Sequence, residues 1–335
     1  MSAGGDLVAR AMTMVDLSVI VVNWNTVQFL LECLRSITPE AIRHPTEILV
    51  VDNGSTDGSP EAVATEFPNV TLIQSGSNLG FARANNLALR RSSGRYVCLI
   101  NPDVVVSEGC LNRMRTYMDE HLSIGILGPK ILNCDSTLQL TCWKFPSVWN
   151  SLCRALALDA MFPRSALFGD WLMRSWAHDT VKRVDILSGC FWMIRRETLD
   201  EVGLLGEEFF LYGEDMDYCK RSWQKGWEIV YLPDATAVHY GGASSSLLPV
   251  RFEVERVKAA LQYWRKHHGR AAHAAYSAIS LLHQVRRILQ GAVRYVFNPS
   301  EKNKFLMDIH AGVACSLFLF RTFASWRSGS LRELQ

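Results

Sequence analysis

Three acidic side chains crowd one short stretch of this 335-residue chain. Glu214, Asp215 and Asp217 follow an aromatic, glycine-containing segment and open an expected helix over residues 214–225. The positive end of a helix dipole stabilises ionised carboxylates, so at least one of the three should accept a proton at neutral pH. Asp215 and Asp217 are two apart and cannot share a helix face. We therefore expect one to face a site and Asp217 to pair with Arg221, the structural alternative being a strongly capped surface helix.

A lone carboxylate, Asp103, follows the apolar segment 95–100 and a proline. Proline has no amide hydrogen, so the strand must end there or lie at an edge, and open α/β sheets bind ligands at the carboxyl ends of strands. Asp103 could hold Mg²⁺ or Mn²⁺ bridging a diphosphate, because these cations prefer oxygen ligands. His239 ends another apolar stretch and could complete the coordination. The alternatives are a helix N-cap at Asp103 or Ser107 and an ordinary core histidine.

Two polar, glycine-containing segments could bind a nucleotide. Asp52 begins the segment 52–59, where a carboxylate at a strand end could accept a hydrogen bond from a nucleobase while small residues let the backbone approach. An Asx-capped turn before a helix near Pro60 is the alternative. Gly80, in the segment 78–82, precedes a helix whose first amides could face a phosphate. Alternatively, the glycine serves only tight packing of a strand and a helix.

The elements that position these residues alternate in type over the first hundred residues. Apolar, β-branched runs predict strands buried on both faces, at 17–22, 47–51, 70–74 and 95–100. Helices are expected between and after them, at 28–37, 82–91 and 111–118. This alternation predicts an α/β fold with a mostly parallel sheet flanked by helices.

The pattern is mixed beyond residue 130. An edge strand over 136–141, a strand-like stretch over 184–194, a helix over 214–225 and two more strands are expected, the last two at 227–232 and 235–240. Aromatic residues and two prolines mark an insertion over the sheet, which contains a helix-like piece at 148–162. We expect a flexible leader over residues 1–15 and a catalytic domain over residues 16–250. Within that domain, residues 145–180 form the insertion, as an acceptor or lid region. A basic amphipathic helical region follows over residues 251–335.

Charge is unevenly distributed along the chain. The net charge is +2 overall, but residues 251–335 carry +9 and residues 1–250 therefore carry −7. Basic residues alternate with apolar ones over 270–335, which suits a helix lying on an anionic membrane surface. Packing of that helix on the catalytic domain or on another subunit, as in a homo-oligomer, is the alternative. No recognition motif points to nucleic acid.

Several observations bear on the compartment. The nine cysteines show no CxxC or CxxxC spacing, as expected for reduced thiols in a cytosolic protein. No stretch reaches the roughly 18 apolar residues of a membrane span, the best candidate being 311–320. The N-terminus lacks a signal pattern. We expect a cytoplasmic protein, peripheral on the inner face of the membrane.

The polar segments occur together and in one order, and in that combination the chain resembles a family 2 glycosyltransferase of the GT-A fold, in the bacterial rhamnosyltransferase-like branch. The resemblance covers residues 17–268. It is carried by SVIVVNWN (18–25), VVDNGSTDGS (50–59), NLGFARANN (78–86), NPDV (101–104), SGCFWMIRRE (188–197), FFLYGEDMDYCKR (209–221) and HYGGAS (239–244).

The resemblance implies roles for individual residues. Asp215 matches the catalytic base, with Glu214 beside it, and Asp103 and His239 match ligands of a divalent cation. The positions implied for the nucleotide and donor sugar are Val22, Asn23, Asp52, Gly80, Ala82, Asn85, Asn101, Asp103, Ser188 and Gly189.

Two departures refine the expected activity. Asn101 and Pro102 stand where the family often has further acids, which leaves fewer charges on a cation. The chain also lacks the Gln-x-x-Arg-Trp element of processive synthases, so one sugar per acceptor is expected.

The implied function is the transfer of one sugar, with inversion, from a nucleoside-diphosphate sugar to a cell-surface glycan or a lipid-linked acceptor. The first choice of donor is dTDP-L-rhamnose. A UDP-sugar donor is the alternative, as is a non-catalytic nucleotide-sugar-binding or scaffold protein. A Rossmann dehydrogenase is disfavoured because the first strand leads to no G-x-G-x-x-G.

Overall fold

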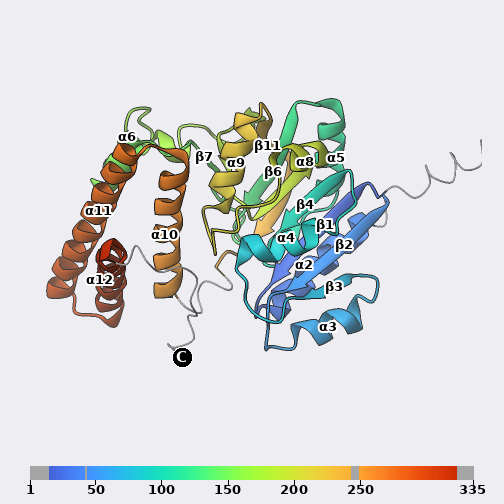
Figure 1. Ribbon diagram of the computed structural model, residues 1–335, viewed down its shortest axis with the longest axis horizontal. Coiled ribbons are helices and arrows are strands. Elements are labelled where there is room, and N and C mark those ends of the chain that lie inside the picture. Colours follow the sequence, from blue (N-terminus) through green and yellow to red (C-terminus); the bar gives the residue numbers. More distant parts are fainter. Residues whose placement is uncertain (1–14, 42–43, 243–248, 323–335) are drawn as a thin grey trace, which may run out of the picture.

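A nine-stranded mixed sheet forms the centre of the fold (Figure 1). The computed structural model describes residues 15–41, 44–242 and 249–322. Apart from Val15, the expected leader lies outside these residues. Eight strands follow one another in the order β3-β2-β1-β4-β10-β6-β11-β5, and β8 pairs with β11.

The first half of the sheet is parallel, as the sequence predicts. Strands β3, β2, β1 and β4 pair in parallel, and helices connect them. Their bounds are β1 (Leu17–Asn23), α2 (Val27–Ala41), β2 (Thr46–Asp52), α3 (Ser59–Glu66), β3 (Thr71–Gln74), α4 (Phe81–Leu89) and β4 (Tyr96–Ile100). All seven residues of β1 are buried because helices cover both faces of the sheet.

The second half is mixed. Strand β10 runs antiparallel to both β4 and β6, whereas β11 runs parallel to β6 and antiparallel to β5. Their bounds are β5 (Val104–Val106), α5 (Cys110–Glu120), β6 (Ile124–Leu132), β10 (Phe191–Arg195), α8 (Arg196–Val202), α9 (Glu214–Gln224) and β11 (Glu228–His239). The antiparallel β10 therefore separates the parallel strands from β6 and β11.

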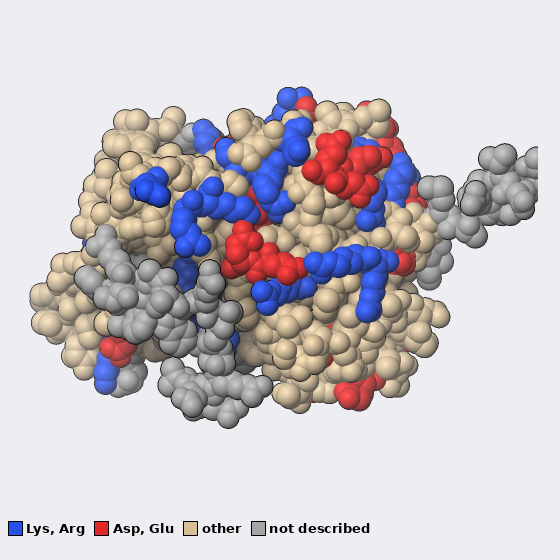
Figure 2. Space-filling view, in the orientation of Figure 1, with Lys and Arg blue, Asp and Glu red and all other residues tan. Residues whose placement is uncertain are grey.

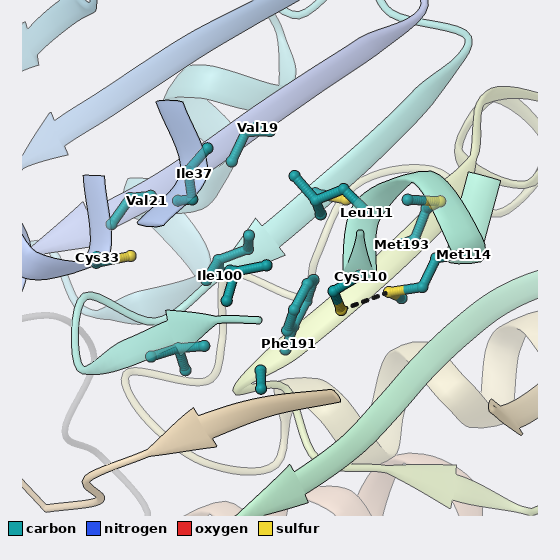
Figure 3. Close-up of a cluster of buried hydrophobic side chains, with 14 of the residues drawn as sticks. Val19, Val21, Cys33, Ile37, Ile100, Cys110, Leu111, Met114, Phe191 and Met193 are labelled. Carbon is teal, nitrogen blue, oxygen red and sulfur yellow. Dashed lines mark hydrogen bonds between the residues drawn. The ribbon is translucent and has the colours of Figure 1, made fainter. Parts of the chain in front are cut away.

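Alternate residues of the strands fill two cores, one on each face of the sheet. Val19 and Val21 of β1 point into the cluster in Figure 3, whereas Ile20 and Val22 belong to the other cluster. In the first cluster the Cys110 thiol lies 3.9 Å from the sulfur of Met114. All nine cysteines are free, and seven of them are buried. Burial raises the pKa of the core thiols, for example that of Cys142 to about 12, which keeps them protonated and unreactive.

Three strand predictions are wrong in detail. Residues 136–141 make only an isolated bridge, between Leu132 and Leu138. The stretch 184–194 is broken into two strands, the first of which pairs with β7 in a separate sheet. The two strands expected over 227–240 are one strand, β11, whose register shifts between Leu232 and Thr236, where a proline removes a ladder donor. The bounds of the short strands are β7 (Cys142–Trp143), β8 (Lys182–Arg183) and β9 (Ile186–Leu187).

Helices of the insertion and of the C-terminal region stand together on one side of the sheet (Figure 1). They are α6 (Val148–Ala155), α7 (Leu158–Met161), the short η1 (Asp170–Leu172), α10 (Pro249–His267), α11 (Arg270–Phe297) and α12 (Glu301–Thr322). Helix α6 opens with a reciprocal capping box between Ser147 and Asn150. The Arg286 side chain on α11 donates to the Ala155 carbonyl at 2.6 Å, which ties α11 to the end of α6. Among the described helices, none combines the length and apolar character needed to cross a bilayer.

Candidate active site

The loops after β1 and β2 form a cluster of polar side chains that are hydrogen-bonded to one another. The Asn23 side chain is buried, donates to the Ser55 hydroxyl at 3.1 Å and accepts from the Thr26 hydroxyl at 2.7 Å. One oxygen of Asp52, Oδ2, accepts from the Ser55 amide at 3.1 Å. The Asx turn expected before the helix near Pro60 is made by Asp57, which accepts from the Ser59 amide at 3.2 Å. The other oxygen of Asp52, Oδ1, is buried with no hydrogen-bond partner in the described part of the chain. An open acceptor at this strand end suits an N–H donor from a ligand.

Gly80 packs so closely against the loop before α9 that a side chain would not fit there. Its φ is +82°, and a Cβ there would lie 2.3 Å from the Phe210 carbonyl oxygen. The same carbonyl accepts from the Phe81 amide at 2.8 Å, so the first free amide of α4 binds the loop before α9. Ala82 and Asn85 are buried, and the Asn85 side chain donates to the Phe81 carbonyl. These residues position α4 and have no surface open to a ligand in this structure.

Asp103 and His239 meet at the junction of β5 and β11. Strand β11 pairs with β5, and the Tyr240 amide donates to the Asp103 carbonyl at 3.0 Å. This pairing brings the His239 Nε2 atom to 3.2 Å from the Asp103 Oδ1 atom. The N-cap of α5 is Gly109, so neither Asp103 nor Ser107 caps that helix. The two predicted metal ligands, 136 residues apart in sequence, are therefore neighbours.

Gln139 orients the histidine, a role that the sequence analysis missed. Its Nε2 donates to the Asn133 side chain at 2.8 Å, which leaves Oε1 facing the His239 Nδ1 at 2.6 Å. An amide oxygen can only accept, so Nδ1 carries a proton. Gln139 lies in an irregular segment. The only feature of the sequence that pointed to this segment was the weak alternation of residues 136–141.

The pair is suited to a shared cation. With Nδ1 protonated by the contact to Gln139, a neutral His239 presents the lone pair of Nε2 to a carboxylate oxygen. Two acceptors at this distance repel each other unless a proton or a metal ion lies between them. No group of three His, Cys, Asp or Glu side chains gathers within the described ranges. The pair would therefore supply two ligands, and Mg²⁺ or Mn²⁺ would take its remaining oxygens from a diphosphate and water.

Asp215 lies beside the loop that follows β9. Its Oδ1 atom accepts from the Met216 amide at 2.7 Å, and a Cβ built at Gly189 would lie 3.4 Å from the Asp215 Cβ atom. The Asn101 amide donates to the Cys190 carbonyl at 2.9 Å, so the segment that leads to Asp103 borders the same loop. The Ser188 amide donates to the Thr141 carbonyl at 2.8 Å, which holds that loop in place. The structure thus brings Asp103, Ser188, Gly189 and Asp215 to one region.

Burial raises the pKa of both Glu214 and Asp215, but their surroundings differ. Burial and the neighbouring Asp215 charge raise the pKa of Glu214 well above its usual value, and its Oε2 atom has no hydrogen-bond partner among the described residues. Burial also raises the pKa of Asp215, but backbone amides, including those of Met216 and Gly189, oppose the shift. A negative charge on one carboxylate disfavours ionisation of its neighbour. Asp215 is therefore the better proton acceptor of the two.

Asp217 pairs with Arg221, as expected, at 2.9 Å. The His267 Nε2 and the Lys266 Nζ atoms also lie 2.7 Å from its other oxygen, Oδ1. Burial alone would raise its pKa, but these partners lower the pKa of Asp217 to about 2. Asp217 therefore ties α9 to α10, and Asp215 points elsewhere.

A cavity of about 470 Å³ opens beside Asp215. Helices α6, α10 and α11 line most of it, and the loop before α9 contributes Tyr212 and Gly213. Tyr212 has a φ of +63°, a conformation that non-glycine residues adopt at a cost and that recurs at functional sites. The carboxylate thus faces a space large enough for a sugar-sized molecule.

Comparison with known proteins identifies relatives of the chain. The family described as Glycosyl transferase family 2 matches residues 18–154. An N-acetylglucosaminyl-diphospho-decaprenol L-rhamnosyltransferase of Mycobacterium tuberculosis is 30% identical over an alignment of 220 residues, which covers 62% of this chain and 71% of the relative. A dTDP-rhamnosyl transferase, RfbF, of Shigella flexneri is 24% identical over 249 residues, covering 71% of this chain and 77% of that protein.

Two solved structures are similar in fold. Mannosyltransferase PcManGT from Pyrobaculum calidifontis, in complex with GDP-Man and Mn²⁺, matches with a TM-score of 0.54 at 18% identity, covering 92% of this chain and 87% of that one. GalNAc-T7 with UDP, GalNAc and Mn²⁺ matches with a TM-score of 0.53 at 14% identity, covering 93% of this chain and 58% of that one.

Proposed function

We propose, from the premise that this chain belongs to glycosyl transferase family 2 and has the α/β GT-A fold, that it moves one sugar with inversion to a cell-surface glycan or lipid-linked acceptor. The chain is a glycosyltransferase that uses a nucleotide sugar, and its relatives include rhamnosyltransferases. Our first choice of donor is therefore dTDP-L-rhamnose. The observation that carries the proposal is the position of Asp215, which packs against the Gly189 loop and opens to a cavity, while the same loop borders the segment that leads to Asp103.

Asp215 acts as the general base in this proposal. Its carboxylate takes the proton from an acceptor hydroxyl while that oxygen attacks the anomeric carbon of the donor and the bond to the diphosphate breaks. One displacement inverts the anomeric configuration. The Met216 amide orients the carboxylate at 2.7 Å, and burial disfavours a second negative charge on Glu214 beside the base. General-base assistance is typically worth about 10²–10⁴-fold in rate.

The donor nucleotide lies, in this proposal, over the carboxyl ends of β1, β2 and β4. The open Oδ1 atom of Asp52 accepts from the base, while Val22 and Asn23 form the floor. Asn101, Ser188 and Gly189 are partly exposed near the diphosphate and sugar. Gly80, Ala82 and Asn85 contribute through the position of α4.

Asp103 and His239 would hold Mg²⁺ or Mn²⁺, since a carboxylate oxygen and an imidazole nitrogen suit either ion. The cation would neutralise charge on the departing diphosphate. In calorimetry with a nucleoside diphosphate and Mn²⁺, Asp103→Ala is expected to weaken the metal-dependent part of binding. Asp135→Ala, at an exposed aspartate, is the matched control. Equal binding by both variants would remove Asp103 from the metal site.

A donor screen tests the proposed reaction. Thermal shift of the purified chain with dTDP-L-rhamnose and with UDP-sugars, each with and without Mn²⁺, should show the largest stabilisation by dTDP-L-rhamnose with the metal. NMR of the product should then show an inverted anomeric centre. Binding without hydrolysis or transfer would instead favour a nucleotide-sugar-binding scaffold, and a retained configuration would contradict the mechanism.

We also place the chain on the inner membrane surface in this proposal, through α11. Leu289, Val293 and Val296 are 57–73% exposed on one face of this helix, and Arg294 beside them is exposed too. Figure 2 shows more basic than acidic side chains over the helical part at the left of the view. Exposed apolar residues with flanking cations suit an anionic membrane surface.

Vesicle sedimentation tests this placement. The double variant Leu289→Ser/Val293→Ser is expected to pellet less with anionic vesicles than the unmodified chain does. Leu122→Ser, at another exposed leucine, is the control. Equal pelleting of all three would assign the face to contact with another subunit, as in a homo-oligomer.

A further inference from the structure

The walls of the cavity beside Asp215 are formed mainly by helices, and not by the loops at the carboxyl ends of the parallel strands. Helix α9 and the loop before it supply one end, and most of the rest comes from α6, η1, α10 and α11, together with Trp143 of β7. The polar cluster at β1 and β2 does not line it. The cavity is thus separate from the nucleotide side, and a molecule held there would reach Asp215 from the opposite direction.

Arg154 is the main cationic group of this cavity. Its guanidinium lies over the Trp171 ring, 4.7 Å from the ring centre, which holds its plane in place. No carboxylate forms an ion pair with it in the parts of the chain that the structure covers. Burial and the nearby Arg256 charge lower the pKa of Arg154, although a guanidinium stays protonated in proteins. Its hydrogen-bond donors are therefore available to a ligand.

Arg256 adds a second guanidinium. Glu253 binds it through two contacts, from Nε at 3.0 Å and from Nη2 at 2.5 Å. Two carboxylates, Glu253 and Asp159, lie near the arginines, and the charges of both act on Arg154. Neither carboxylate forms an ion pair with Arg154 among the described residues, so this end of the cavity keeps guanidinium donors that no carboxylate occupies. Forked guanidinium donors match the oxygens of a phosphate group better than a single carboxylate does.

Aromatic rings form the rest of the wall. Trp143 and Trp171 stack at 6.5 Å with an interplanar angle of 18°, and Trp264 stacks on Tyr276 at 4.8 Å. Flat aromatic surfaces with a few polar groups suit the apolar face of a sugar ring. The cavity therefore combines a surface for a sugar, a carboxylate at one end and guanidinium groups elsewhere in its wall.

We propose that this cavity binds the acceptor as a sugar phosphate, with Arg154 and Arg256 on the phosphate oxygens, the tryptophans against the ring and Asp215 beside the accepting hydroxyl. This inference rests on the proposed function, because it assigns the base to the same Asp215. It makes the acceptor a phosphate or diphosphate ester, either lipid-linked or soluble, rather than a neutral glycan end.

Quenching of tryptophan fluorescence tests binding without turnover, because three tryptophans line the cavity. The full-length chain is titrated with N-acetylglucosamine 1-phosphate, with N-acetylglucosamine and with inorganic phosphate. We expect the sugar phosphate to bind at least about tenfold more tightly than either part. Arg154→Gln should lose at least about tenfold in affinity, since a hydrogen bond to a charged group contributes roughly 10–150-fold. Arg164→Gln, at an exposed arginine of the same insertion, should bind as the unmodified chain does.

Equal affinity for the sugar and its phosphate in the unmodified chain would overturn the inference, as would full affinity in Arg154→Gln. The first comparison needs no variant, so misfolding of Arg154→Gln leaves the test intact. A short isoprenyl diphosphate ester of the sugar distinguishes the sources, because tighter binding of this ester indicates a lipid-linked acceptor. Donor hydrolysis with no sugar-phosphate binding would overturn only this inference, whereas absence of donor binding and hydrolysis would overturn the proposed function.

Discussion

The two sides of Asp215 are built in different ways. On the strand side, polar groups lie in loops after neighbouring parallel strands, and each is bonded to a nearby backbone or side chain. On the helical side, the cavity wall comes mainly from α6 and from α10 and α11, which follow α6 by about a hundred residues of sequence. The family match over residues 18–154 contains the strand side and α6 up to Arg154, whereas α10 and α11 lie beyond it. Acceptor choice in our proposal therefore depends on a wall of which only one part lies within the family match.

Two contacts join these sides. The Gly80 backbone packs on the Phe210 carbonyl, and Asp217 holds α9 to α10 through His267 and Lys266. Both contacts fix the loop and helix that carry Asp215. Substitutions at these two contacts should therefore lower the stability of the fold more than they weaken ligand binding. Substitutions on the strand side should affect the donor alone, and substitutions in the cavity wall should affect the acceptor alone.

The largest expected effect is at the base itself. Asp215→Asn should lower the turnover number by about 10²–10⁴-fold while donor binding stays the same, because the amide cannot accept the proton. Glu214→Gln should lose far less, since burial already favours the uncharged form of Glu214 and the amide has the same shape. Steady-state kinetics and calorimetry with the donor measure both quantities. Near-normal turnover in Asp215→Asn would refute the assignment.

The next effect concerns the junction at Gly80. Gly80→Ala should lower the free energy of unfolding by about 2–4 kcal/mol, because the residue has a positive φ and its Cβ would overlap the Phe210 carbonyl. Gly58 has the same φ of +82° but nothing within 4 Å of its Cβ position, so Gly58→Ala should cost about 1–2 kcal/mol. Urea unfolding measures the difference, and equal costs would show that the contact with Phe210 contributes nothing.

A pH effect of slightly smaller size concerns Asp217. Its pKa of about 2 lies below the value of roughly 3.9 in an unfolded chain. The depressed pKa therefore contributes about 2–3 kcal/mol of stability above pH 4, and this contribution is lost as the pH falls from about 4 to 2. Asp217→Asn should be less stable at pH 7 and should lack this part of the pH dependence. Parallel pH profiles of unfolding for the two proteins would contradict the role of Asp217.

The smallest effect is expected at Gln139. Gln139→Leu should weaken Mn²⁺-dependent nucleotide binding by about 10-fold, because His239 loses the partner that fixes its tautomer and orientation. Gln224→Leu, at an exposed position at the end of α9, is the control. Titration of Mn²⁺ at a fixed nucleotide concentration measures the change. No difference between the variants would leave His239 oriented by the backbone alone.

The sequence by itself determined the parallel half of the sheet and the segments that carry the chemistry. Strands and helices alternate there, buried runs such as 17–22 have one secondary structure that suits them, and Asp103 had to follow a strand end because of its proline. The pairing of Asp217 with Arg221 was also predictable, since residues four apart on a helix are neighbours.

Only the tertiary structure decided how distant segments meet. Gln139 reaches His239 across an irregular segment, and β11 runs on past Pro233, where the sequence predicts a break. Arg154 and Arg256 come together from α6 and α10, and no periodicity relates residues so far apart. The raised pKa of Glu214 depends on its burial, which a first-turn position does not reveal. Local patterns specify local hydrogen bonding and burial, whereas contacts between distant segments depend on how whole elements pack.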